Sequence, residues 1–136
     1  MRSYKRIERC IARYLASRYR KVAEIGIGAN IDVAVMLRSA GIDVIATDRY
    51  LPQGTDLPIP VAVDDIFNPC DSLYRGAEAL YAIRPGPEMV PPLIALARRI
   101  SADLLVYHLG GELHGDGGEV IDCGVILHRY HRAGDA

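Results

Sequence analysis

The ten residues Lys21–Asn30 constrain the fold more than any other stretch of the chain. They read KVAEIGIGAN, a short apolar run that ends in Gly26 and Gly28. In the segment that follows, 31–40, apolar residues recur at helical spacing. An apolar run, a glycine turn and a helix predict a buried strand that leads into a crossover helix and then into a parallel neighbouring strand.

A second apolar run, 42–47, ends at Asp48, twenty residues after Gly28. Bare glycines let a ligand approach the backbone, and an acid at this distance accepts hydrogen bonds from ribose hydroxyls. The pair therefore predicts a nucleotide site. The dinucleotide fingerprint needs a third glycine where Ile31 stands, and no Gly-Lys-Ser/Thr of a phosphate-binding loop follows, so NAD and nucleotide hydrolysis are disfavoured.

The rest of the chain continues the alternation of strands and helices. A proline-rich loop is expected over 50–60 and a glycine-rich loop over 110–118, and the other segments expected are strands at 61–63, 78–83, 103–108 and 120–130 and helices at 71–75 and 89–100. The last strand is expected to be antiparallel, because a short glycine loop suits a hairpin. The pattern predicts an α/β fold, a Rossmann-like three-layer sandwich with a mostly parallel sheet of about six strands and a C-terminal antiparallel strand.

Length and composition fit one domain over 1–136, with the sheet and crossover helices in 21–136. Three well-separated cysteines do not suggest a disulfide scaffold, and they favour a reducing compartment. Neither a signal peptide nor an apolar run long enough to cross a membrane is recognisable. The cytoplasm is the expected location.

Positive charge gathers at the N-terminus. Residues 1–21 carry eight Lys or Arg and one acid, a sum of +7, and the remaining residues sum to −8. The pattern predicts an amphipathic helix over 3–19 within a basic segment 1–20. Such a helix can bind RNA or an acidic protein partner, or it can be a solvated face that balances an acidic body.

The glycine turn has the pattern acid-x-Gly-x-Gly-x-small polar, formed by Glu24, Gly26, Gly28 and Asn30. On this motif, on Asp48 and on the segment 63–67, the stretch from Val22 to Tyr107 resembles the class I S-adenosylmethionine-dependent methyltransferases. It also looks like a small uncharacterised archaeal family with that fold. The resemblance implies S-adenosylmethionine as the cofactor.

The resemblance also implies a role for each matching position. The turn at Gly26 and Gly28, within the motif that Glu24 and Asn30 complete, would face the methionine part of the cofactor. Asp48 would hold the ribose hydroxyls, and Ile66 would lie against the adenine ring. Asp65 would meet the adenine amino group, a role that the neighbouring Asp64 could take instead.

The expected site departs from the resemblance after the fourth strand. Methyltransferases that act on exocyclic amines usually have Asn/Asp-Pro-Pro-aromatic there, whereas this chain has Arg84-Pro-Gly-Pro. Arg84 can hold an anionic substrate group, pair with Glu112 or brace the turn. Glu112 and His114, in the glycine-rich loop, are the acid–base candidates. The final hairpin customary in these enzymes is expected to be reduced to one strand.

No metal site is predicted. His128-x-x-His131 is the most suggestive histidine pair, but on a regular strand this spacing directs the two rings to opposite faces. Three functions stay open: a methyltransferase, a non-catalytic module that acts as a cofactor sensor or as a subunit binding RNA or protein, and, less favoured, an NAD-binding domain.

Overall fold

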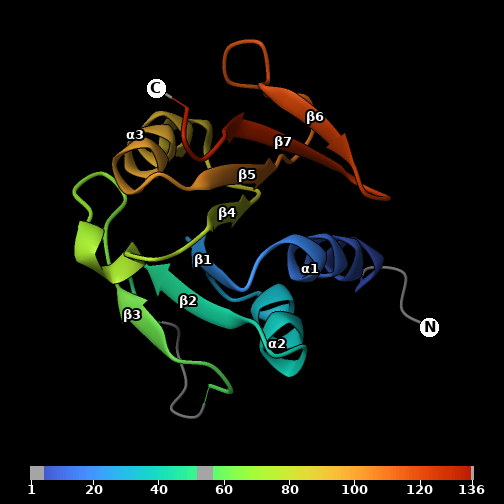
Figure 1. The fold of residues 1–136 in the computed structure, drawn as a ribbon, viewed down its shortest axis with the longest axis vertical. Helices are drawn as coiled ribbons and strands as arrows, with labels where there is room; N and C mark the ends of the chain where they lie inside the picture. Colours follow the sequence, from blue (N-terminus) through green and yellow to red (C-terminus); the bar gives the residue numbers. More distant parts are fainter. Residues whose placement is uncertain (1–4, 52–56, 136) are drawn as a thin grey trace.

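The computed structural model describes residues 5–51 and 57–135, which form a three-layer α/β sandwich (Figure 1). Residues 3–4 of the expected N-terminal helix and 52–56 of the expected proline loop lie outside the described residues. The elements are, in order, α1 (Lys5–Arg18), β1 (Lys21–Ile25), α2 (Asp32–Ser39), β2 (Asp43–Asp48), β3 (Val61–Val63), the 3-10 helix η1 (Asp71–Tyr74), β4 (Ala79–Ile83), the 3-10 helix η2 (Pro87–Met89), α3 (Val90–Ile100), β5 (Asp103–Tyr107), β6 (Glu119–Asp122) and β7 (Ile126–His131).

The sheet has the strand order β3-β2-β1-β4-β5-β7-β6. Every neighbouring pair from β3 to β5 is parallel, and β7 is antiparallel to both β5 and β6. The order runs one way from β1 to β3 and the other way through β4 and β5. In open α/β sheets, ligands bind outside the carboxyl ends of the strands at such a switch point.

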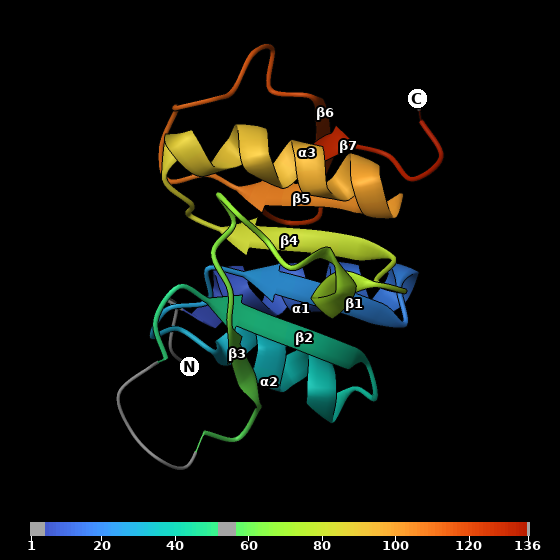
Figure 2. The same ribbon diagram turned by 90° about the vertical axis from the view of Figure 1, so that its left-hand side faces the viewer.

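Two apolar cores lie on opposite faces of the sheet. Helices α1 and α2 pack side by side over one face, where Leu15 and Leu37 are fully buried. Helix α3 and η1 cover the other face, where Leu93 and Tyr74 are fully buried (Figure 2). Strands β1 to β5 are parallel, so the loops that follow their carboxyl ends lie at one edge of the sheet.

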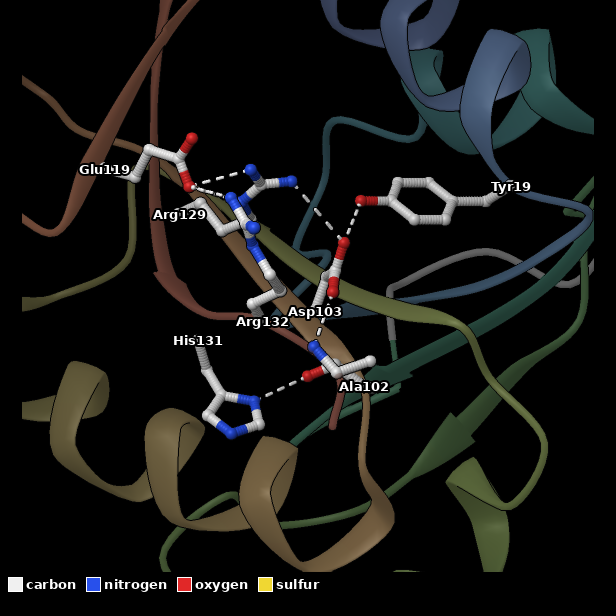
Figure 3. A network of polar contacts seen from close by, with 8 residues as sticks. Tyr19, Ala102, Asp103, Glu119, Arg129, His131 and Arg132 are labelled. Carbon is white, nitrogen blue, oxygen red and sulfur yellow. Dashed lines mark hydrogen bonds and ion pairs between the residues drawn. The ribbon is translucent and has the colours of Figure 1, made fainter. Parts of the chain in front are cut away.

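A polar network ties the N-terminal helix to the far edge of the sheet (Figure 3). The Tyr19 hydroxyl, just after α1, donates to Asp103 Oδ2 at 2.5 Å, and Arg129 Nη1 lies 3.7 Å from the same oxygen. Arg129 and Arg132 both donate to Glu119 Oε1, at 2.7 and 2.9 Å. The network joins β5, β6 and β7 to the end of α1, which fixes the C-terminal hairpin on the sheet.

The predicted fold class is confirmed, and one element is corrected. The expected final strand 120–130 is two strands, β6 and β7, so the hairpin expected to be reduced is present. The interruption is a tight turn in which Asp122 Oδ1 accepts the Gly124 N–H at 3.0 Å and Cys123 N–H donates to the Val125 carbonyl. Gly124 has φ +104°, a conformation that favours glycine and ends a strand.

Within residues 5–51 and 57–135, no helix is both long enough and apolar enough to span a lipid bilayer.

Candidate functional site

A cavity of about 320 Å³ opens where β1, β2, β3 and β4 end. Its volume falls in the usual range for small-molecule sites. The segments after all four strands contribute to its wall, including the residues Gly26, Asp48, Asp65, Ile66, Arg84 and Met89. The sequence prediction of a site built from strand ends is therefore matched by a cavity at that edge.

The glycine turn follows β1, and its first glycine, Gly26, lines this cavity. Gly26 and Gly28 have φ of +73° and +58°, which only glycine adopts without strain. The amides of Gly26 and Ile27 both donate to the Thr47 carbonyl of β2, at 2.9 and 3.1 Å. A Cβ on Gly26 would lie 3.2 Å from Met89 Cε, so a side chain here would crowd the cavity wall.

Asp48 joins the end of β2 to the glycine turn. Its Oδ2 accepts the Gly28 N–H at 2.7 Å and its Oδ1 accepts the Tyr50 N–H at 3.1 Å. Each carboxylate oxygen has two acceptor positions, so each retains one for a ligand. Asp48 is therefore held in a fixed orientation at the cavity wall with acceptors to spare, which suits a pair of neighbouring hydroxyls.

The two acids after β3 differ in what they contact. Asp64 Oδ1 accepts the Cys70 N–H at 3.0 Å, and its Oδ2 accepts the buried Tyr74 hydroxyl. Asp65 makes a turn contact with Oδ1, which accepts the Phe67 N–H at 3.0 Å. Asp65 thus has more free acceptor capacity than Asp64, and Ile66 beside it is a buried part of the cavity wall.

The cavity is acidic. Among the described residues, its lining holds four carboxylates and two guanidinium groups, which are Asp48, Asp64, Asp65, Glu88, Arg49 and Arg84. A surplus of negative charge disfavours phosphates and favours a cation. The site is therefore suited to a positively charged nucleoside better than to a nucleotide.

Two motif residues lie behind this cavity. Glu24 is 2% exposed, and its Oε1 accepts the Tyr81 hydroxyl of β4 at 2.7 Å. Burial raises the pKa of the Glu24 carboxyl from 4.5 to about 8, and the Tyr81 hydrogen bond lowers it in part. Asn30 accepts the Asp32 N–H at the start of α2. Neither side chain is part of the cavity lining, so both act on the glycine turn through packing and capping.

Arg84 has an unusual backbone at the end of β4. It is one of two non-glycine residues with positive φ in the described parts of the chain, at +53°. Its N–H donates to the Tyr107 carbonyl at 2.6 Å, and its guanidinium lies 5.2 Å from the Tyr107 ring centre. Its ion-pair partner is Glu8, at 3.9 Å, rather than Glu112. Of the three roles expected for Arg84, bracing the turn matches these contacts.

Glu8 is a residue that the sequence did not single out. It lies on the buried side of α1 and is 3% exposed, although it is an acid in a strongly basic helix. Its Oε2 accepts a hydrogen bond from Asn30 Nδ2 at 3.1 Å, and no group in the described part of the chain hydrogen-bonds to its Oε1. The sequence signal for its burial is its position three residues before Ile11, which places Glu8 on the apolar face of the helix. Through Asn30 and Arg84, Glu8 links α1 to the ends of β1 and β4.

Glu112 and His114 are exposed in the loop after β5. The His114 N–H donates to the Tyr130 hydroxyl at 3.1 Å, and the His114 and Tyr130 ring centres are 6.0 Å apart. The Tyr130 hydroxyl also lies 2.6 Å from His108 Nε2. Burial and the nearby His128 lower the pKa of His108. The glycine-rich loop thus places His114 in a histidine–tyrosine cluster, and none of residues 110–118 is among the described residues that line the cavity at Asp48.

The prediction that His128 and His131 point to opposite faces is wrong. His128 pairs with Val106 and His131 pairs with Leu104, and both partners belong to the core under α3. Tyr130 is left unpaired as a β-bulge. This extra residue shifts the alternation along β7, so the side chains of His128 and His131 lie on the same face of the sheet. The described residues contain no group of three His, Cys, Asp or Glu side chains arranged to hold a metal ion.

Solved structures with this fold include S-adenosylmethionine-dependent methyltransferases. The chain superposes on the methyltransferase SibL with a TM-score of 0.50 and 15% identity, over 76% of this chain and 36% of that one. On the sugar N-methyltransferase KedS8 of Streptoalloteichus the TM-score is 0.51 and the identity 20%, over 95% of this chain and 60% of the other. These similarities establish a methyltransferase-like fold.

Sequence relatives come from archaea. A UPF0146 protein of Pyrococcus horikoshii is 38% identical over 81% of this chain and 87% of its own length. A UPF0146 protein of Archaeoglobus fulgidus is 39% identical over 75% of this chain and 78% of its own. The model of the uncharacterised protein family UPF0146 matches residues 6–117. The chain therefore belongs to the UPF0146 family.

Proposed function

We propose that this protein binds S-adenosylmethionine in the cavity between the ends of β1 and β4. The observation that carries the proposal is the orientation of Asp48, which the Gly28 and Tyr50 amides hold at the cavity wall with one acceptor position free on each oxygen. A carboxylate held in this way suits the two hydroxyls of a ribose. Asp65 would accept from the adenine amino group, with Ile66 against the ring.

The charge of the cavity supports S-adenosylmethionine over other adenosine compounds. S-adenosylmethionine carries a sulfonium, an ammonium and one carboxylate, so it is a net cation, whereas NAD and ATP carry phosphates and are net anions. Four carboxylates against two arginines favour the former and repel the latter. When bound, the sulfonium would supply an activated methyl group, and the protein would align it with an acceptor.

A titration calorimeter tests the proposal with S-adenosylmethionine, S-adenosylhomocysteine and NAD as separate ligands. We expect the first two to bind in the micromolar range and NAD to give no heat. Asp48→Asn should weaken both ligands roughly 10- to 100-fold, because a hydrogen bond to a charged group contributes about 1.5–3 kcal/mol. Its remaining oxygen can still accept the Gly28 N–H.

Asp43→Asn is the matched control, since Asp43 is exposed at the opposite end of the same strand. It should leave both affinities unchanged. Unaltered binding by the Asp48 variant, or binding of NAD alone, would contradict the site assignment.

The alternative function is that of a non-catalytic cofactor sensor, which would use the same site. One observation favours this alternative. The guanidinium of Arg84 stands where amine methyltransferases place an acceptor group, and it packs on Tyr107 and faces Glu8. A guanidinium has no acceptor for an amine proton. Binding without methyl transfer to any acceptor would favour the sensor.

A further inference from the structure

We infer that a second cavity, between the end of β5 and the start of β7, binds the methyl acceptor, and that His128 removes its proton. The inference rests on the proposed function. This cavity has a volume of about 370 Å³, and it is lined by Tyr107, His108, Gly110, Val125, Ile126 and His128. Because β7 is antiparallel to β5, its first residues lie at the same edge of the sheet as the cofactor cavity.

The two cavities share a wall made of two stacked side chains. Arg84 lines the cofactor cavity, and Tyr107 lines the second one. The Arg84 guanidinium lies 5.2 Å from the Tyr107 ring centre, and the Arg84 N–H donates to the Tyr107 carbonyl. Methyl transfer between them requires that a shift of this pair connects the two cavities, so that an acceptor in the second cavity faces a methyl group in the first.

The geometry defines the protonation of the His128 ring. Its Nδ1 lies 2.8 Å from the Gly117 carbonyl, which can only accept, so Nδ1 carries the proton and Nε2 has the lone pair. Within residues 5–51 and 57–135, no group hydrogen-bonds to this Nε2. A Cβ on Gly117 would lie 3.3 Å from Nδ1, so the close approach of the loop depends on glycine. His128 is thus an oriented base in the cavity wall.

The neighbouring His108 is unsuited to the same task. The Tyr130 hydroxyl accepts the His114 N–H, so its own proton is available to the lone pair of His108 Nε2 at 2.6 Å. This leaves Nδ1 of His108 as a donor. The His108 ring meets the His128 ring edge-on, with centres 5.2 Å apart, which restricts the rotation of His128. His108 therefore acts as a positioning residue.

The lining indicates the class of acceptor. Three ring side chains and two aliphatic ones suit a small planar molecule, and a neutral imidazole suits a weakly acidic hydroxyl. The acceptor would be an aromatic or heteroaromatic alcohol. Its oxygen attacks the methyl carbon, the new C–O bond forms as the C–S bond breaks, and the bonding pair stays on sulfur. The hydroxyl proton goes to His128 Nε2 and from the imidazolium to solvent.

The chromogenic phenol 4-nitrophenol tests this site without any cofactor, because its ionised form absorbs at longer wavelength than its neutral form. At a pH where free 4-nitrophenol is mostly neutral, the wild-type protein should bind it saturably and raise the phenolate absorbance. His128→Asn should reduce that increase at least tenfold, since the Asn amide can replace Nδ1 toward Gly117 but has no group at Nε2.

His131→Asn is the matched control. The Nδ1 of His131 also lies 2.8 Å from a backbone carbonyl, that of Ala102, at the other end of β7. Its variant should behave like wild type. Should His128→Asn fail to fold, nitrogen NMR of the wild-type protein replaces it, and the His128 Nε2 signal should move from unprotonated to protonated on addition of 4-nitrophenol.

The outcomes separate this inference from the proposed function. Absence of saturable binding, or equal absorbance from the His128 variant, overturns the inference, and calorimetry with S-adenosylmethionine then shows whether the cofactor site stands without it. Binding of 4-nitrophenol by a protein that does not bind S-adenosylmethionine overturns the proposed function and the acceptor role together.

Discussion

Replacing Glu24 by glutamine should remove most of the pH dependence of stability between pH 5 and 8. The carboxyl lies in the core with the Tyr81 hydroxyl as its hydrogen-bond donor at 2.7 Å. Burial raises its pKa from 4.5 to about 8, more than the Tyr81 bond lowers it. Glutamine has nearly the same shape and can still accept from Tyr81, but it does not titrate.

The direction and size follow from proton binding in the two states. Below about pH 4.5 the Glu24 carboxyl is protonated whether the chain is folded or unfolded. The free energy of unfolding is therefore not reduced by Glu24 in this range. As the pH rises toward 8 the unfolded state loses this proton and the folded state keeps it, so stability falls. Each pH unit costs about 1.4 kcal/mol, which gives a loss of roughly 4 kcal/mol between pH 5 and 8.

Urea denaturation at each pH unit from 5 to 10 measures this loss. The free energy of unfolding of wild type should fall relative to that of Glu24→Gln as the pH rises, and the difference should level off above pH 8. Glu112→Gln is the control, because Glu112 is exposed, and its curve should run parallel to wild type. Parallel curves for Glu24→Gln and wild type would refute the assignment of a neutral buried carboxyl.

Three further changes test the surrounding structure. Tyr81→Phe should raise the pKa of Glu24 above that in wild type, because the hydrogen bond that favours the ionised form is lost, and denaturation curves should then keep falling above pH 8. Asp103→Asn should cost about 2–4 kcal/mol of unfolding free energy, because the buried Arg129 keeps only one of its two carboxylate partners and the Tyr19 hydroxyl loses its charged acceptor. Glu119→Gln, at the exposed end of the same network, should cost clearly less, and equal losses in urea would refute the dependence on burial. Gly118→Ala should lower the melting temperature by several degrees, with a loss of at least about 2 kcal/mol, because its φ is +65° and a Cβ would lie 2.5 Å from a backbone carbonyl of β7; an unchanged melting curve would contradict this close contact.

The parts of the fold that sequence predicts well are those with local signals. The strand, glycine turn and helix around Gly26 were predicted because each has a local signal in the sequence. These signals are an apolar run, a pair of glycines and apolar residues at helical spacing. The split of the last strand at Gly124 was missed, since one glycine in an alternating run is compatible with a continuous strand until Asp122 is seen to cap the turn. The shared face of His128 and His131 was missed for a related reason, because the bulge comes from pairing with β5.

The same difference between local and long-range signals applies to the candidate site. Asp48 and Asp65 were predicted because a strand end is a local feature, and the parallel arrangement then brings strand ends together. Glu8 and His128 come from the two ends of the chain, and only the packing of α1 and the antiparallel β7 brings them to this edge. The sequence around Glu8 and His128 does not predict that they lie at this edge of the sheet.

The structure gives Glu24 a physical role that differs from the one its motif predicts. Its place before the glycine turn matches a cofactor-binding pattern, but alternation along β1 sends its side chain into the core toward Tyr81. There it joins β1 to β4 through the Tyr81 hydroxyl, next to the strand ends that border the cavity at Asp48. If this is its task, Glu24→Gln should change the stability as described and leave the affinity for S-adenosylmethionine within about twofold of wild type. A tenfold loss of affinity without loss of stability would instead favour direct contact with the cofactor.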